Sequence, residues 1–363
     1  MKSQSKFLFT SESVGEGHPD KICDQVADAI LDECLKQNPL SKVAIEVAVR
    51  PGLVIVFGVV HFIPQLDIDA IVRFVLKDIG YTSPDQELDY RTCQVMDCVE
   101  LHPSLFNGIS SGLEAPDDEP AGDQGMAFGY ATDETPQLLP LTLHLAHRIS
   151  RELKSRPHQS HPPMASTGHQ GTGYRGHTPG VPLEKLRQGI LDKVVRKSIP
   201  AKYLDDRTAY HIQPTGDVGV SPSGKFAGVT GRKIVVDTYG GWGAHGGGAF
   251  SGKDFRQVDR SAAYMARWIA KSLVHHGLAH RCLIQLSYSI GIAEPLSIFI
   301  DTFKTSKFTS DQLKEIIRKN FDLRPAAIAK DLNLIDPIYY QTAKNGHFTN
   351  EKFPWEQPLD LVL

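Results

Sequence analysis

Seven glycines between Gly240 and Lys253 constrain this chain of 363 residues more than any other segment. The segment reads Gly-Gly-Trp-Gly-Ala-His-Gly-Gly-Gly-Ala-Phe-Ser-Gly-Lys, and Asp254 follows at once. Glycine loses more conformational entropy on ordering than any other residue. An ordered run therefore predicts either unusual backbone angles or a close approach of main-chain N–H groups to an anion such as phosphate. A mobile surface loop is the alternative.

The sequence around the glycine run separates it from the common phosphate-binding loops. The run lacks the Gly-x-x-x-x-Gly-Lys-[Ser/Thr] pattern, and it lacks the strand–GxGxxG–helix context of a dinucleotide site. Its flanks predict a buried strand over Ile234–Thr238 and a long amphipathic helix over Val258–His276. These flanks favour an ordered loop over a mobile one.

Charge and cysteine content exclude several classes of protein. The net charge is −3 and no long run of like charge occurs, so we expect neither a nucleic acid nor a membrane surface as a partner. The five cysteines are odd in number and lack zinc-type spacing, which fits reduced thiols. We find no apolar signal region and no stretch of about 18 apolar residues, and we therefore predict a cytoplasmic protein.

The order of predicted elements indicates an α+β protein with helices packed on sheets. Helical spacing occurs over 20–36, 67–79, 138–153, 183–199, 258–276 and 310–321, and strand-like runs over 43–49, 53–62, 93–101, 234–238, 281–290 and 296–302. Arg50-Pro51-Gly52 predicts a hairpin turn. We place domains at 1–108, 119–228 and 229–363.

The segment 155–182 is rich in histidine, proline and glycine and has almost no aliphatic residue. Such a composition cannot contribute a helix or strand to a core, so we predict a disordered loop. Its histidines have irregular spacing and no nearby acids, which disfavours a metal site.

The short loop before the first predicted helix concentrates charge. It contains Glu12, Glu16, His18, Asp20 and Lys21. Carboxylates beside a helix N-terminus are typical of a site for Mg²⁺ and phosphate, since Mg²⁺ takes few protein oxygens and the helix dipole favours anions. A solvated N-cap loop is the alternative reading.

Further charged residues lie beside glycines later in the chain. Asp123 stands between glycines, Arg232 and Lys233 adjoin the predicted strand at 234–238, Lys253 closes the glycine run, and Asp259 follows it. Together, these cations could hold a triphosphate.

Four segments carry a resemblance to a known family. These are Ser11–Gln25, Gly122–Tyr130, Gly231–Asp254 and Val258–Tyr264, and through them the chain resembles S-adenosylmethionine synthetase, or methionine adenosyltransferase. The resemblance implies an α+β protomer of three similar sheet-and-helix domains in a pseudo-threefold arrangement, with the central domain truncated here. It also implies a homodimer or dimer of dimers with sites between subunits. The substrates would be ATP and L-methionine, the cofactors Mg²⁺ and K⁺, and the products S-adenosylmethionine, phosphate and diphosphate.

The resemblance also implies roles for individual residues. Catalytic roles fall to His18, Lys253 and Asp259; ATP contacts to His18, Asp123, Thr215, Gly216, Arg232, Lys233, Ala249 and Lys253; a substrate contact to Gln257; and metal contacts to Glu12, Asp20 and Glu46.

Several positions depart from the family pattern. Val59 replaces a carboxylate expected to meet the amino group of methionine; the other departures are Leu101, Val218, Phe226, Gln257 and the segment 155–182, which stands where a lysine-bearing strand is expected. Three hypotheses stay open. The chain is an active synthetase, a catalytically impaired member that regulates an active synthetase, or the defective product of a gene copy.

Overall fold

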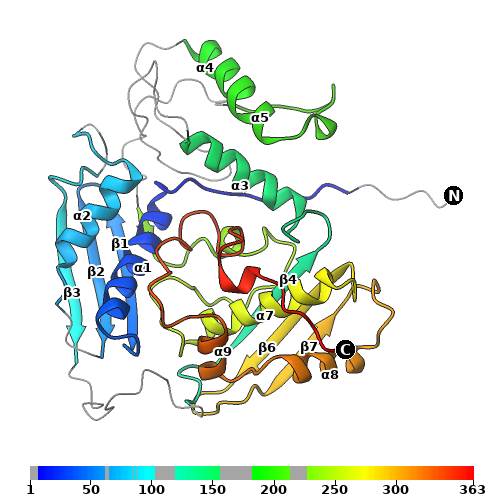
Figure 1. Cartoon of the computed structure of the whole chain (residues 1–363). Helices are drawn as coiled ribbons and strands as arrows, with labels where there is room; N and C mark the ends of the chain where they lie inside the picture. Colours follow the sequence, from blue (N-terminus) through cyan, green and yellow to red (C-terminus); the bar gives the residue numbers. More distant parts are fainter. Residues whose placement is uncertain are drawn as a thin grey trace.

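The computed structural model of the chain describes residues 7–61, 65–84, 86, 88–102, 119–155, 182–212 and 227–363. These residues form a four-stranded and a three-stranded sheet, each with helices against one face (Figure 1). The predicted α+β class is therefore confirmed.

The first sheet has the strand order β3-β2-β1-β5. Strands β1 (Val43–Arg50) and β2 (Leu53–Val60) form the predicted hairpin, and the turn needs Gly52 because its φ is +70°. Strand β3 (Gln94–Leu101) runs parallel to β2. The short strand β5 (Gly228–Val229) adds to the free edge of β1 from far along the chain.

Helices α1 (Pro19–Gln37) and α2 (Ile68–Ile79) cover one face of this sheet. Alternate side chains of β1, such as Val43 and Val47, are buried toward the helices. The opposite face carries Glu46 and Phe57, and Phe57 is 40% exposed. This second face of the sheet is therefore uncovered within the described residues.

The second sheet joins distant parts of the chain. Its antiparallel strands are β4 (Gly125–Thr132), β6 (Arg281–Tyr288) and β7 (Ser297–Asp301). Helix α7 (Val258–His275) crosses β4 so closely that a Cβ on Gly129 would lie 1.9 Å from the carbonyl oxygen of Ala266. Glycine in β4 thus allows the helix to reach the strand.

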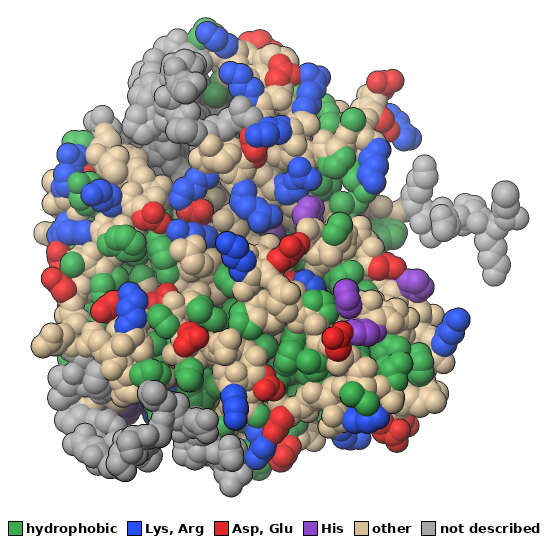
Figure 2. All heavy atoms as spheres, in the orientation of Figure 1, with side chains coloured by type: hydrophobic (Ala, Val, Ile, Leu, Met, Phe, Trp, Pro, Cys, Tyr) green, Lys and Arg blue, Asp and Glu red, His purple; other side chains and the backbone are tan. Residues whose placement is uncertain are grey.

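The remaining helices and turns lie around the two sheets. They are α3 (Leu141–Lys154), α4 (Leu183–Ile190), a π-helical turn (Leu191–Val195), α5 (Arg196–Ser198), α6 (Ile234–Asp237), α8 (Ser310–Asn320), α9 (Pro325–Asp331) and 3₁₀ turns at Ala201–Tyr203 and Pro354–Glu356. Figure 2 shows the molecule from the same side as Figure 1, with Lys and Arg side chains gathered over the upper part, where α3, α4 and α5 lie. None of the described helices is long and apolar enough to cross a membrane.

One sequence prediction about secondary structure is wrong. The strand expected over 234–238 is the helical turn α6, because Asp237 is held by tertiary contacts: its carboxylate accepts from Lys21 at 2.7 Å and its carbonyl from the N–H of His347 at 2.9 Å. The helix expected over 183–199 is present as a continuous helical run from Leu183 to Ser198, and its middle turn, Leu191–Val195, is π-helical. Of the predicted disordered loop, residues 156–181 lie outside the described residues.

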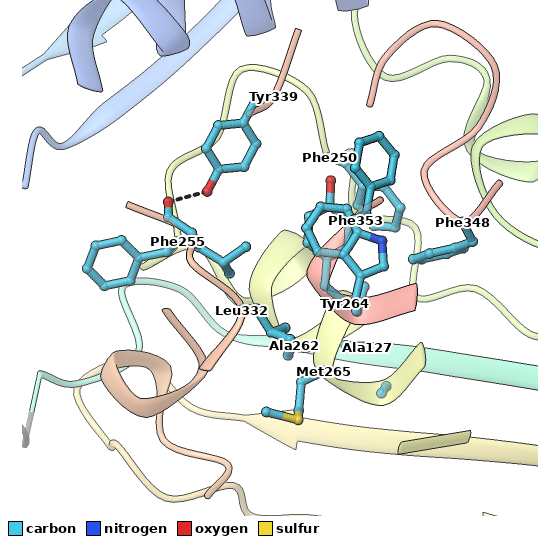
Figure 3. Close-up of a cluster of buried hydrophobic side chains, with 14 of the residues drawn as sticks. Ala127, Phe250, Phe255, Ala262, Tyr264, Met265, Leu332, Tyr339, Phe348 and Phe353 are labelled. Atoms are coloured by element: carbon cyan, nitrogen blue, oxygen red, sulfur yellow. Dashed lines mark hydrogen bonds between the residues drawn. The ribbon is translucent and has the colours of Figure 1, made fainter. Parts of the chain in front are cut away.

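The core between α7 and the C-terminal residues 348–355 is aromatic (Figure 3). Tyr264 stacks on Trp355 with ring centroids 3.9 Å apart. Phe250, near the end of the glycine run, packs edge-on against Tyr264 at 5.6 Å and lies close to Phe348 in the same cluster. Burial of Phe250 therefore anchors the end of the glycine run in the core.

Candidate active site

The N-terminus of α1 holds His18 in one orientation. His18 is the N-cap, Pro19 begins the helix, and the N–H of Asp20 donates to Nδ1 of His18 at 3.1 Å. Because Nδ1 accepts this bond, we assign the proton of the neutral ring to Nε2. The His18 side chain thus carries a donor N–H on the ring edge away from the helix backbone.

Asp20 brings two predicted phosphate-binding residues to the same helix end. Its carboxylate accepts from the ammonium group of Lys233 at 2.6 Å and from the N–H of Val229 at 3.1 Å. Arg232 approaches the same carboxylate at 4.0 Å, and its side chain is 61% exposed. The structure therefore groups His18, Asp20, Arg232 and Lys233 at the N-terminus of α1.

Lys253 and Asp259 form a second charged group. Their side chains are 2.7 Å apart and each is less than one-fifth exposed. Asp259 lies in the first turn of α7, where a carboxylate is favoured by the helix dipole. A Cβ on Gly248 would lie 2.1 Å from the carboxyl carbon of Asp259, so the glycine run makes room for this acid.

Strand β1 connects the two charged groups. Thr230 bonds the backbone of Val47, and Lys253 forms an antiparallel bridge with Ala44. Glu46 lies between these points, and burial raises the pKa of its carboxyl while the charge of Lys253 opposes that rise. The cation-bearing segments therefore flank one half-buried carboxylate.

The glycine run is packed against protein along much of its length. A Cβ on Gly246 would lie 1.8 Å from the carbonyl oxygen of Met126, and one on Gly252, whose φ is +81°, would lie 1.9 Å from that of Ile45. The predicted unusual backbone angle is thus confirmed at Gly252, and the close neighbours of both glycines are protein atoms. Anion binding by the run stays a prediction.

The segment before α1 fixes the other end of the glycine run and passes along α3 (Figure 1). Phe9 stacks on Trp242 at 4.0 Å, and the hydroxyl of Ser11 donates to the carbonyl of Gly240 at 2.8 Å. Thr142 of α3 bonds both Ser11 and the indole N–H of Trp242. Three separate parts of the chain therefore meet at Gly240–Trp242.

Other predicted site residues form no hydrogen bond or ion pair with Asp20 or Lys253 in the described part of the chain. Glu12 is exposed and has no hydrogen-bond partner among the described residues, and Asp123 accepts only from the N–H of Gln124 there. The side-chain amide of Gln257 donates to the carbonyl of Val43 at 3.0 Å. Ala249 lies against Gly231, where an added Cβ would be 2.3 Å from its own. Thr215, Gly216, Val218 and Phe226 fall outside the described residues.

The described residues contain no group of three or more His, Cys, Asp or Glu side chains able to hold a metal ion. Both oxygens of Asp20 already accept hydrogen bonds, from Lys233 and from Val229. The described carboxylates therefore do not form a complete set of protein ligands for a metal ion. They fit a divalent ion that takes most of its ligands from phosphate and water.

Sequence reasoning missed the polar face of α1. Asp24 accepts from the N–H of Gly231 and from Lys21, while Asp28 accepts from the N–H of Gly252 and pairs with Arg260. Aspartates at 20, 24, 28 and 32 repeat every four residues, which places them on one helix face. This repeat was the signal that could have revealed them.

The fold and site define an α+β protein with cations gathered around a helix N-terminus and a glycine-rich loop. Three family models match the chain in order: the N-terminal domain of S-adenosylmethionine synthetase over residues 6–103, its central domain over 118–170 and its C-terminal domain over 220–357. The chain therefore belongs to the S-adenosylmethionine synthetase family. The central match is the shortest, in agreement with the predicted truncation.

Proposed function

We propose that this protein is a methionine adenosyltransferase that forms S-adenosylmethionine from ATP and L-methionine and releases phosphate and diphosphate. The observation that carries the proposal is the convergence of Arg232 and Lys233 on Asp20, beside His18, with Lys253 held on the same strand edge. A triphosphate needs several cations in one place, and membership of the S-adenosylmethionine synthetase family supports ATP and L-methionine as the proposed substrates.

The reaction displaces triphosphate from the ribose C5′ of ATP by the sulfur of methionine. Negative charge develops on the departing oxygen, and preorganised donors stabilise it. The Nε2–H of His18 is suited to donate there, since its ring is fixed by the bond to Asp20. Arg232, Lys233 and Lys253 would hold the phosphate oxygens through the displacement and the later hydrolysis of the triphosphate.

Metal ions would act on the same groups. A Mg²⁺ ion bound with the triphosphate would neutralise phosphate charge, and Glu12, Asp20 and Asp259 are the carboxylates that would hold it. Burial raises the pKa of Glu46, the charge of Asp24 raises it further, and a K⁺ ion would stabilise the Glu46 carboxylate. In this proposal Asp123 contacts the ribose, Thr215, Gly216 and Ala249 contact the nucleotide, and Gln257 contacts substrate.

A homodimer, or a dimer of dimers, is also part of the proposal. The uncovered sheet faces expose large apolar side chains, which include Phe57, Met96, Met126 and Phe299, each at least 40% exposed. Large apolar side chains exposed on a sheet face are typical of protein interfaces. Glu46 lies on one of these faces, so a partner subunit docked there would border the site.

A catalytically impaired regulatory partner is the second candidate. Val59 places an apolar side chain where the resemblance expects a carboxylate, and Gln257 is tied to the carbonyl of Val43. Each lost charge contact costs about 1.5–3 kcal/mol. Several such losses would reduce turnover by orders of magnitude.

Purified protein incubated with ATP, methionine, MgCl₂ and KCl tests the proposal. Formation of S-adenosylmethionine by the wild type, lost in a Lys253→Met variant, is the expected result. No product from a folded wild type would reject the enzyme proposal. If that protein then binds an active synthetase and changes its kinetics, the regulatory alternative holds.

A further inference from the structure

Four aspartates on one face of α1 hold segments that lie between residues 229 and 340. Each accepts main-chain N–H groups: Asp20 from Val229 (3.1 Å), Asp24 from Gly231 (2.8 Å), Asp28 from Gly252 (2.8 Å), and Asp32 from Tyr339 and Tyr340 (2.8 and 2.9 Å). Charge-assisted bonds to carboxylates are stronger than neutral ones. The helix therefore fixes the backbone of these segments at defined points.

We propose that Asp24 and Asp28 are positioning residues for the cations of the polyphosphate site. Asp24 fixes the backbone next to Arg232, and Asp28, together with Arg260, fixes the backbone of Lys253. This inference rests on the proposed function and deepens it, because it explains how two cations are oriented before the triphosphate arrives.

The backbone of Lys253 is held on both sides. The N–H of Gly252 donates to Asp28, and a guanidinium N–H of Arg260 donates to the carbonyl of Lys253 at 3.3 Å. Arg260 also grips Asp28 through two bonds of 2.7 and 2.9 Å, and both side chains are at most 1% exposed. A lysine is a flexible cation, so fixing its backbone reduces the ordering cost of anion binding.

The backbone next to Arg232 is held by a buried charge group. Asp24 accepts from the N–H of Gly231 while Lys21 lies between Asp24 and Asp237, at 2.9 and 2.7 Å. One ammonium therefore faces two carboxylates, and burial raises the pKa of both acids. Asp24 can lose its charge without leaving Lys21 unpaired, since Asp237 remains.

Asp32 provides a comparison within the same helix face. It makes the same kind of bonds as Asp24 and Asp28, but to Tyr339 and Tyr340. That segment carries none of the predicted phosphate-binding cations. If the aspartates had a purely structural role, substitution of Asp32 would weaken tripolyphosphate binding as much as substitution of Asp24 or Asp28.

The test compares Asp24→Asn and Arg260→Lys with Asp32→Asn in the full chain. We expect the Kd for tripolyphosphate, measured by calorimetry, to rise about three- to tenfold in the first two variants. The KM for methionine should stay unchanged in both. Asp32→Asn should change the Kd less than about twofold, even where its thermal stability falls as much.

A double-mutant cycle separates positioning from general loosening. In an Arg232→Gln background, Asp24→Asn should weaken tripolyphosphate binding by less than it does alone, because the cation that it positions is gone. If Arg260→Lys does not fold, this cycle tests the inference. If Asp24→Asn does not fold, the comparison of Arg260→Lys with Asp32→Asn tests it.

The outcomes distinguish the inference from the proposed function. Unchanged Kd values in Asp24→Asn and Arg260→Lys, an equal effect of Asp32→Asn, or strict additivity with Arg232→Gln would overturn positioning and leave the proposed function standing. A folded wild type that does not bind tripolyphosphate would reject the proposed function, and the inference with it.

Discussion

The ammonium group of Lys253 lies 2.7 Å from the carboxylate of Asp259, on the side of the glycine run where α7 begins. The pair neutralises a cation that the proposed reaction needs for phosphate. A triphosphate must therefore either displace Asp259 from Lys253 or bring a metal ion that occupies the acid.

Substitution of Asp259 by Asn tests this competition. Without divalent ions, Asp259→Asn should bind tripolyphosphate about two- to fivefold more tightly than the wild type, since a partly buried ion pair is worth about 0.5–1 kcal/mol. Mg²⁺ should tighten the binding of tripolyphosphate to the wild type, and it should tighten the binding to Asp259→Asn less. Calorimetry with and without MgCl₂ measures both effects.

Asp311→Asn is the matched control for that experiment. It removes one negative charge at an exposed pair with Lys314, at 3.4 Å, so it changes the net charge equally. Weaker binding by Asp259→Asn in the absence of metal would contradict the competition.

Gly246 tests why the run contains glycine. Its ideal Cβ lies 1.8 Å from the carbonyl oxygen of Met126, which is backbone and cannot rotate away. We expect Gly246→Ala to lower the free energy of unfolding by about 1–3 kcal/mol. Thermal denaturation measures the loss, and Gly15→Ala, where a Cβ has nothing within 4 Å, is the control. Equal stability of the two variants would show that Gly246 is not needed for packing.

Periodicity was sufficient where one face of an element is apolar. The helix starting near Asp20 and the hairpin around Gly52 follow from it, and both are present in the structure. It failed at Ile234–Thr238, because three β-branched or aliphatic residues in a row resemble a strand. Contacts from Lys21 and His347, distant in sequence, decide that segment instead.

The candidate site shows the same division. Motif resemblance predicts Arg232, Lys233 and Lys253, and the structure places Arg232 and Lys233 on Asp20. It does not predict that Asp24 and Asp28 hold the neighbouring backbone, since polar residues on a helix usually face water. Only the structure shows that the C-terminal segments cover this face of α1.

Asp32 gives the stability of the protein a pH dependence. Burial raises the pKa of its carboxyl to about 7, against the bonds from Tyr339 and Tyr340, with Asp28 raising it and Arg260 lowering it. The folded protein therefore binds a proton that the unfolded chain, with a pKa of about 3.9, releases. By linkage, this group's contribution to stability falls as pH rises from about 4 to about 7.

The variant Asp32→Asn isolates that contribution. An amide does not titrate, so the wild type should lose more stability between pH 5 and pH 7 than the variant does, by about 1–3 kcal/mol. Urea denaturation at each pH measures the difference in slope. Parallel pH profiles for the two proteins would contradict the raised pKa.

A substitution at Val59 tests whether catalysis is limited by the absence of the carboxylate that the family pattern has at this position. The residue is half-buried on β2, its side chain lies on the uncovered face, and its register partner on β3 is Glu100. We expect Val59→Glu to lower the KM for methionine about tenfold, because a charged contact to the amino group is worth about 1.5–3 kcal/mol. Repulsion from Glu100 reduces that gain, so a Val59→Glu, Glu100→Gln double variant should bind methionine more tightly still. Initial rates at saturating ATP measure both, with Val59→Gln as the uncharged control of similar size. An unchanged KM in all three variants would place the methionine amino group away from this strand.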